Sequence, residues 1–195
     1  ENGYELRILA KEGENPSWDN VEVVRGDIND FSVLDEACKN VDTIIHLAGI
    51  IDYHNKQLTD KINYEGTRNT VNAAIKNNIP RFVFMSSVSV YGKSKYLPMD
   101  ENHPKNPKNC YGESKMLAEN YVMSSGLNCV IIRAPAIYGK EYMEGFANIL
   151  KAIKSGKMSI IGDGKNHIQF IHVSDCVQAF LLILSRKDAN GVFNI

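Results

Sequence analysis

The stretch Arg81-Phe82-Val83-Phe84-Met85-Ser86-Ser87 decides the fold of this chain. Its apolar run is short and ends in two hydroxyl residues, which is typical of a buried strand that leads into a polar loop. That loop ends at Tyr111-Gly112-Glu113-Ser114-Lys115, where a helical pattern begins. Residues four positions apart are neighbours on one helix face. The strand end and the helix start therefore predict one site that contains Ser87, Tyr111 and Lys115.

Short apolar strands alternate with amphipathic helices on both sides of this stretch. Strands are predicted at 5–10, 21–24, 43–46, 128–133, 159–161, 169–172 and 192–195, and helices at 31–39, 58–77, 146–154 and 174–185. Such alternation predicts a parallel sheet with helices on both faces, a doubly wound α/β fold of the Rossmann type. Ligands of such folds bind outside the carboxyl ends of the strands. Those ends carry Lys11, Asp27, Ala48-Gly49, Ser87 and Pro135.

The composition is that of an ordinary globular domain. The chain has 195 residues and a net charge of -1, which gives no indication of nucleic acid or an anionic membrane as a partner. No apolar run reaches the ~18 residues of a membrane span, and no signal peptide is recognisable. The four cysteines and five histidines have no ligand spacing. We therefore expect reduced thiols, no metal site and a cytoplasmic protein.

A series of short motifs follows in order along the chain. They are Val24-Arg25-Gly26-Asp27-Ile28, Ile45-His46-Leu47-Ala48-Gly49, Asn63-Tyr64-Glu65-Gly66-Thr67, Phe84-Met85-Ser86-Ser87-Val88-Ser89-Val90-Tyr91-Gly92, Tyr111-Gly112-Glu113-Ser114-Lys115, Arg133-Ala134-Pro135-Ala136-Ile137-Tyr138-Gly139 and Phe170-Ile171-His172-Val173-Ser174-Asp175. Together they resemble the extended short-chain dehydrogenases/reductases, the NAD-dependent epimerase/dehydratase family. The resemblance covers essentially the whole chain. It implies an enzyme that moves hydride between a nicotinamide and a secondary alcohol or ketone carbon.

Ser87, Tyr111 and Lys115 are the catalytic residues that this resemblance implies. A phenol is a poor base at neutral pH because its ordinary pKa is about 10, but an ammonium group one helical turn away favours the phenolate. Tyr111 would then exchange a proton with the substrate alcohol. Ser87 would orient the same oxygen, and Ser89 would also face the substrate. The alternative is that Tyr111 is an ordinary helix-opening tyrosine and Lys115 a solvated charge.

The resemblance also implies a set of cofactor contacts. They are Lys11, Asp27, Ile28, Leu47, Ala48, Gly49, Asn63, Tyr111, Lys115 and Pro135. Asp27 and Ile28 correspond to an adenine-binding pair, and small residues at 48 and 49 permit close approach of the cofactor. Asn63 could hydrogen-bond that loop or the cofactor, or could simply start a helix.

Cofactor choice depends on the end of the first strand. An acidic residue there would bind the ribose 2′-hydroxyl and favour NAD. This chain has Lys11, which could pair with a 2′-phosphate and so slightly favours NADP over NAD. An exposed loop lysine without a cofactor role is the alternative.

Substrate class is narrowed by the residues after Ser87. Sugar 4,6-dehydratases of the family carry an Asp-Glu pair where this chain has Val88 and Ser89, so no acid is available to eliminate water. We favour a nucleotide-sugar 4-epimerase, because Tyr91-Gly92 resembles such enzymes. An NADP-dependent ketone reductase resembling dihydroflavonol reductase or 3β-hydroxysteroid dehydrogenase is the alternative, supported by Lys11 and by Ala136 at a position where epimerases carry Asn. A non-catalytic NAD(P)-binding regulator and a purely structural fragment are further alternatives.

Both ends of the chain depart from the family pattern. We expect residues 1–195 to form one NAD(P)-binding domain without its first strand and its C-terminal substrate lobe, and residues 140–172 to extend towards that lobe. The absent strand would be central, so a gap in the hydrogen-bond ladder is expected. By the same resemblance, helices 58–77 and 111–124 would form a homodimer, although their apolar residues could equally pack against the sheet.

Overall fold

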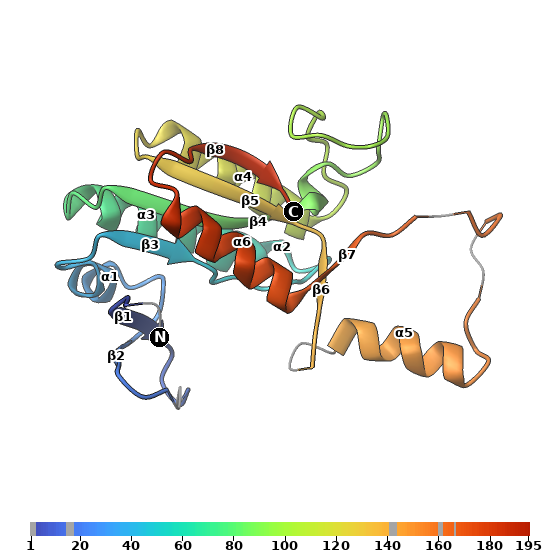
Figure 1. Ribbon diagram of the computed structural model, residues 1–195, viewed down its shortest axis with the longest axis horizontal. Helices are drawn as coiled ribbons and strands as arrows, with labels where there is room; N and C mark the ends of the chain where they lie inside the picture. Colours follow the sequence, from blue (N-terminus) through green and yellow to red (C-terminus); the bar gives the residue numbers. More distant parts are fainter. Residues whose placement is uncertain (1–2, 15–17, 141–143, 160–161, 166) are drawn as a thin grey trace.

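Every paired strand of the computed structural model runs parallel to its neighbour (Figure 1). The structure describes residues 3–14, 18–140, 144–159, 162–165 and 167–195. The strands are β1 Leu6–Ala10, β2 Val21–Arg25, β3 Thr43–His46, β4 Arg81–Ser87, β5 Cys129–Ala134, β6 Ala136–Tyr138, β7 Phe170–His172 and β8 Gly191–Asn194. The helices are α1 Phe31–Ala37, α2 Lys56–Thr59, η1 Asp60–Glu65, α3 Gly66–Lys76, η2 Val88–Val90, α4 Cys110–Ser124, α5 Glu144–Lys154 and α6 Val173–Ser185. The predicted doubly wound α/β fold is confirmed.

The central sheet has the strand order β3-β4-β5-β8 and is covered on both faces (Figure 1). Successive residues of a strand point to opposite faces, and β4 shows the consequence. Phe82 and Phe84 pack with Val122 and other residues of α1, α3 and α4 on one face. Val83 packs with Ile183 of α6 on the other. Burial on both faces explains why β4 reads as a continuous apolar run.

β1 and β2 form a separate two-stranded sheet. Arg7 of β1 ties this pair to the rest of the fold, because its guanidinium donates to the carbonyl oxygens of Ala37 and Lys39 at the end of α1. Within the described residues, β1 is hydrogen-bonded to β2 and not to β3. The ladder is therefore interrupted between β1 and β3, as expected from the sequence.

The predicted helix 58–77 is three consecutive helical segments. It begins at Lys56, because the Asn55 side chain accepts from Leu58 N, and it contains the π-helix η1 before α3. Single π-turns occur frequently at functional sites. Helix α6 also begins earlier than predicted, because His172 caps its N-terminus through Nδ1, which accepts from Ser174 N.

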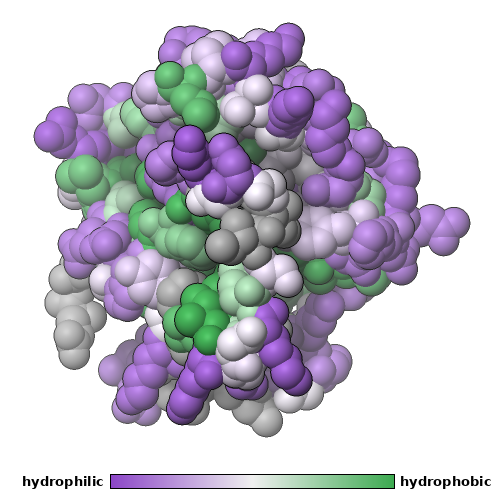
Figure 2. All heavy atoms as spheres, turned by 90° about the vertical axis from the view of Figure 1, so that its right-hand side faces the viewer, coloured by the Kyte–Doolittle hydropathy of each residue, from purple (hydrophilic) through white to green (hydrophobic). Residues whose placement is uncertain are grey.

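The segment from β6 to β7 extends away from the central sheet and carries α5 (Figure 1). Figure 2 views the molecule from this side and shows apolar and hydrophilic side chains interspersed on the surface. Residues 162–164 form a turn, whereas the predicted strand 159–161 falls largely on residues outside the described part. The extension of residues 140–172 towards a substrate lobe stays a prediction.

Candidate active site

Ser87 and Tyr111 are brought together where β4 ends and α4 begins. Ser87 Oγ accepts from Ser89 N and donates to Ser89 Oγ, both at 3.1 Å, which closes the turn η2. Asn109 starts α4 by accepting from Gly112 N at 2.8 Å. A Cβ on Gly112 would lie 2.6 Å from the Ser89 carbonyl oxygen. Only glycine therefore permits the first turn of α4, with Tyr111 in it, to pack directly on the Ser87–Ser89 turn.

Lys115 lies one turn further along α4 and is only 4% exposed. Its Nζ donates to the Met85 carbonyl oxygen at 2.8 Å and lies 4.8 Å from the centre of the Phe84 ring. Burial lowers the pKa of Lys115 to about 8, although attraction to the Glu119 carboxylate opposes this effect. The site thus holds a poorly hydrated amine beside the end of β4, which is the kind of perturbed group that active sites contain.

The loop after β3 completes the same edge of the sheet. Leu47, Ala48 and Gly49 are exposed, and a Cβ on Gly49 would lie 3.4 Å from Lys115 Nζ and 3.1 Å from Asn63 Oδ1. Glycine at position 49 therefore permits the Asn63 side chain and the Lys115 amine to pack closely against the backbone of this loop.

Asn63, in the π-helix η1, is fully buried beneath that loop. Its Oδ1 accepts from Ile50 N at 2.8 Å, and its Nδ2 donates to Ile50 O and to Ser114 Oγ, each at 3.0 Å. Ser114 Oγ in turn donates to the Tyr111 carbonyl oxygen at 2.8 Å. Asn63 therefore links the loop to the helix that carries Tyr111, the first of the roles expected for it, whereas a direct cofactor contact stays a prediction.

The remaining predicted cofactor contacts lie along the neighbouring strand ends. Asp27 is exposed, and hydrogen bonds from the backbone and side chain of Asn29 lower its pKa below the usual value, with a smaller contribution from Lys11. Ile28 is buried against α3, since a Cβ on Gly66 would lie 2.9 Å from its Cγ2. The other two predicted cofactor contacts are Lys11, which is exposed after β1, and Pro135, which is buried after β5.

Sequence reasoning missed a buried ionic cluster next to the site. The Glu119 carboxylate is fully buried, accepts from Arg133 Nε at 3.0 Å and Nη2 at 2.8 Å, and also accepts from Ser86 Oγ at 2.5 Å. Arg133 Nη1 donates to the Tyr91 hydroxyl at 2.7 Å. An arginine within the otherwise apolar strand 129–134 was the available signal, because a buried arginine requires a partner.

Tyr91 and Lys95 are four positions apart, as Tyr111 and Lys115 are, but the two pairs lie in different structural surroundings. Tyr91 is buried and its hydroxyl donates to Asn194 Oδ1 at 2.7 Å, whereas Lys95 lies on an exposed loop. Only Tyr111 and Lys115 lie on one helix, α4.

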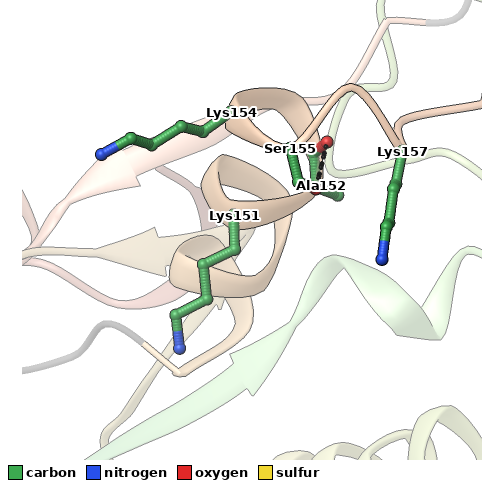
Figure 3. Close-up of a pocket in the computed structure, with 5 residues that line it drawn as sticks. All are labelled: Lys151, Ala152, Lys154, Ser155 and Lys157. Carbon is green, nitrogen blue, oxygen red and sulfur yellow. Dashed lines mark hydrogen bonds between the residues drawn. The ribbon is translucent and has the colours of Figure 1, made fainter.

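Other features of the described residues do not add a site. Figure 3 shows a hollow beside the end of α5, where the side chains of Lys151, Lys154 and Lys157 point in different directions and do not converge. No helix in the described part of the chain combines the length and apolar composition that crossing a membrane requires. The same residues contain no cluster of three or more His, Cys, Asp or Glu that could hold a metal ion.

Comparison with known proteins agrees with this geometry. The chain matches the family model described as "NAD dependent epimerase/dehydratase family" over residues 1–195. It is 36% identical over 161 residues to the N-acetyl-alpha-D-glucosaminyl-diphospho-ditrans,octacis-undecaprenol 4-epimerase of Escherichia coli O157:H7, which covers 78% of this chain and 48% of the relative. It is 35% identical over 218 aligned residues to a putative UDP-glucose 4-epimerase of Methanocaldococcus jannaschii, covering 100% of this chain and 70% of that protein.

A solved structure is similar over almost the whole chain. MoeE5 in complex with UDP-glucose and NAD superposes with a TM-score of 0.83 at 27% identity, covering 97% of this chain and 67% of that one. The chain thus spans between about half and seven tenths of the length of these proteins. The family match over residues 1–195 and the similarity to the Methanocaldococcus jannaschii protein lead to one assignment. This chain belongs to the NAD-dependent epimerase/dehydratase family.

Proposed function

We propose that this chain carries the NAD-binding and catalytic parts of a nucleotide-sugar 4-epimerase. The observation that carries the proposal is the packing of the first turn of α4, which contains Tyr111, on the Ser87–Ser89 turn, with the buried Lys115 amine one helical turn further along α4. The names of the two relatives support 4-epimerisation, and the MoeE5 complex supports NAD and a UDP-sugar as the ligand classes.

The residues at the strand ends fit a dinucleotide. Gly49 lets the Lys115 amine pack against the loop after β3, since a Cβ at this position would lie 3.4 Å from Lys115 Nζ. In our proposal Lys115 donates to the ribose hydroxyls of the cofactor, and the Asp27 carboxylate accepts from the adenine amine. A bound nicotinamide would supply a reversible hydride acceptor beside Tyr111.

In our proposal, Ser87, Tyr111 and Lys115 have different roles in proton transfer. Ser87 Oγ accepts from Ser89 N, so its own proton can be donated to the substrate oxygen in place of Ser89 Oγ. Tyr111 would take the proton of the sugar C4 hydroxyl and return it after the sugar has presented its other face. With a pKa of about 8, Lys115 is mainly protonated at pH 7 and favours the phenolate of Tyr111.

Val88 and Ser89 support epimerisation over dehydration. Water can leave a sugar only if an acid protonates the departing hydroxyl, and neither residue can act as that acid. Ser89 is instead hydrogen-bonded to Ser87 Oγ, to which its backbone N–H donates and from which its hydroxyl oxygen accepts.

A second candidate is an NADP-dependent ketone reductase, which Lys11 favours. Lys11 is exposed at the end of β1, and its charge contributes to the lowered pKa of Asp27. In this alternative, Lys11 would lie at the adenosine end of the proposed cofactor site and pair with a 2′-phosphate.

The test is to purify the protein, denature it and identify the nucleotide it releases, then supply UDP-glucose or UDP-galactose and follow interconversion. We expect NAD and sugar interconversion, with a decrease of about 10²–10⁴-fold in kcat for Tyr111→Phe. Tyr121→Phe is the matched control, because Tyr121 lies on the same helix and its hydroxyl donates to Asn72 instead. NADPH preference without sugar turnover would establish the reductase, and an active Tyr111→Phe variant would refute the assigned role.

A further inference from the structure

A second tyrosine, Tyr53, lies beside the proposed catalytic tyrosine. The ring centres of Tyr53 and Tyr111 are 6.1 Å apart, and the rings are nearly perpendicular at 87°. Tyr111 is 8% exposed, whereas Tyr53 is 52% exposed. Tyr53 therefore continues the wall of the site outward from Tyr111 and presents aromatic surface to whatever approaches that residue.

The position of Tyr53 is fixed by its neighbours in the loop. Cys110 Sγ donates to the Asp52 carbonyl oxygen at 3.3 Å, which ties the loop to the start of α4. The Asp52 carboxylate accepts from His54 N at 2.8 Å and from Asn55 N at 2.9 Å. The backbone at residue 53 is thus held on both sides by contacts that do not use the Tyr53 side chain, so this side chain can be changed without removing them.

The Tyr53 side chain has the chemistry of a sugar-binding surface. Its hydroxyl has no hydrogen-bond partner in the part of the chain that the structure describes, so it is available to a ligand. An aromatic ring with a polar tip offers an apolar face together with a hydrogen-bonding group. A pyranose matches both, because one face of its ring consists of C–H groups while its edge carries hydroxyls. The exposed side chain of Ile51 adds apolar surface two residues earlier.

We propose that Tyr53 determines specificity for the sugar part of the substrate, with its exposed face packed against the pyranose ring whose C4 hydroxyl reaches Tyr111. The inference rests on the proposed function, since it takes a sugar nucleotide as the substrate class. It predicts that Tyr53 contributes to binding of the sugar and not of the nucleotide.

The experiment compares Tyr53→Ala, Tyr53→Leu and Tyr53→Phe with the wild type, using UDP and UDP-glucose as probes in the presence of NAD. We expect Tyr53→Ala to weaken UDP-glucose binding about tenfold in calorimetry and to raise KM equally, with UDP affinity and kcat unchanged. Tyr53→Phe keeps the ring and should stay within about threefold of the wild type, while Tyr53→Leu should resemble the alanine variant. Tyr4→Ala is the matched control, because Tyr4 is 51% exposed and precedes β1, which belongs to the separate β1–β2 sheet.

Each outcome separates this inference from the proposed function. If the wild type interconverts the sugars and Tyr53→Ala binds UDP-glucose as tightly as the wild type does, the role of Tyr53 is refuted. The proposed epimerase function is then still supported. If Tyr53→Ala loses affinity for UDP-glucose but not for UDP, and the wild type shows no turnover, the result supports the sugar-binding role of Tyr53. The proposed epimerase function is then refuted. Equal losses for UDP and UDP-glucose, or no UDP-glucose binding by the wild type, would overturn the inference.

Discussion

Replacing Lys115 by methionine should stabilise the protein while it abolishes activity. The pKa of Lys115 is lowered from 10.5 to about 8 because burial removes hydration from the ammonium group. That difference corresponds to about 3 kcal/mol of unfavourable free energy for the charged form in the folded state. Methionine is also unbranched and apolar, so it can occupy the same space. The variant loses the hydrogen bond to Met85 O and the contact with the Phe84 ring, which we take as about 1 kcal/mol each. We expect a net gain of about 1–2 kcal/mol at pH 7.

The gain should depend on pH in a defined direction. Below pH 8 the lysine is protonated in both the folded and the unfolded state, so the full cost of burial is present. Between pH 8 and pH 10.5 the folded protein has lost this proton and the unfolded chain retains it, so wild-type stability rises with pH. At pH 10 the remaining cost is about 1 kcal/mol. Methionine does not titrate, so the advantage of the variant should shrink by about 2 kcal/mol over this range.

Urea unfolding of both proteins at pH 7 and pH 10 measures these differences, provided that the slopes of the transitions agree. Lys93→Met is the control, because Lys93 lies on an exposed loop, and this variant should show no pH-dependent difference of that kind. A Lys115→Met variant that is less stable than the wild type at pH 7 would refute the reasoning. A gain of the same size at both pH values would show that burial of the charge is not its source.

Three other results are expected. Glu119→Ala leaves the Arg133 guanidinium buried without its partner, which should cost about 3–5 kcal/mol in urea unfolding, and a loss below about 1 kcal/mol would contradict the pairing. Gly92→Ala places a Cβ 1.9 Å from the Asn106 carbonyl oxygen at a φ of +65°, so we expect at least about 2 kcal/mol of destabilisation and a lower Tm. If α4 forms the predicted homodimer, Leu117→Lys, which changes a residue 37% exposed on that helix, should convert dimer to monomer in light scattering. A monomeric wild type would reject the dimer.

The sequence by itself determined the elements and the location of the site. The apolar run 81–86 and the Asp30 cap of α1 are local features, because periodicity and capping depend on a few neighbouring residues. The parallel arrangement followed from alternation of strands and helices, and it placed Ser87 and Tyr111 at one edge of the sheet. The helical pattern that begins at Tyr111 also placed Lys115 on the same helix face, one turn further along.

Tertiary structure decided how that site is supported. Glu119 and Arg133 are 14 positions apart and meet only because α4 packs on β5. Asn63 reaches Ser114, 51 positions away, from within a π-helix that helical periodicity does not reveal. Tyr53 meets Tyr111 only through the path of the loop after β3. Each contact joins residues far apart in the chain, and its geometry depends on how helices and loops pack on the sheet, which local propensity does not encode.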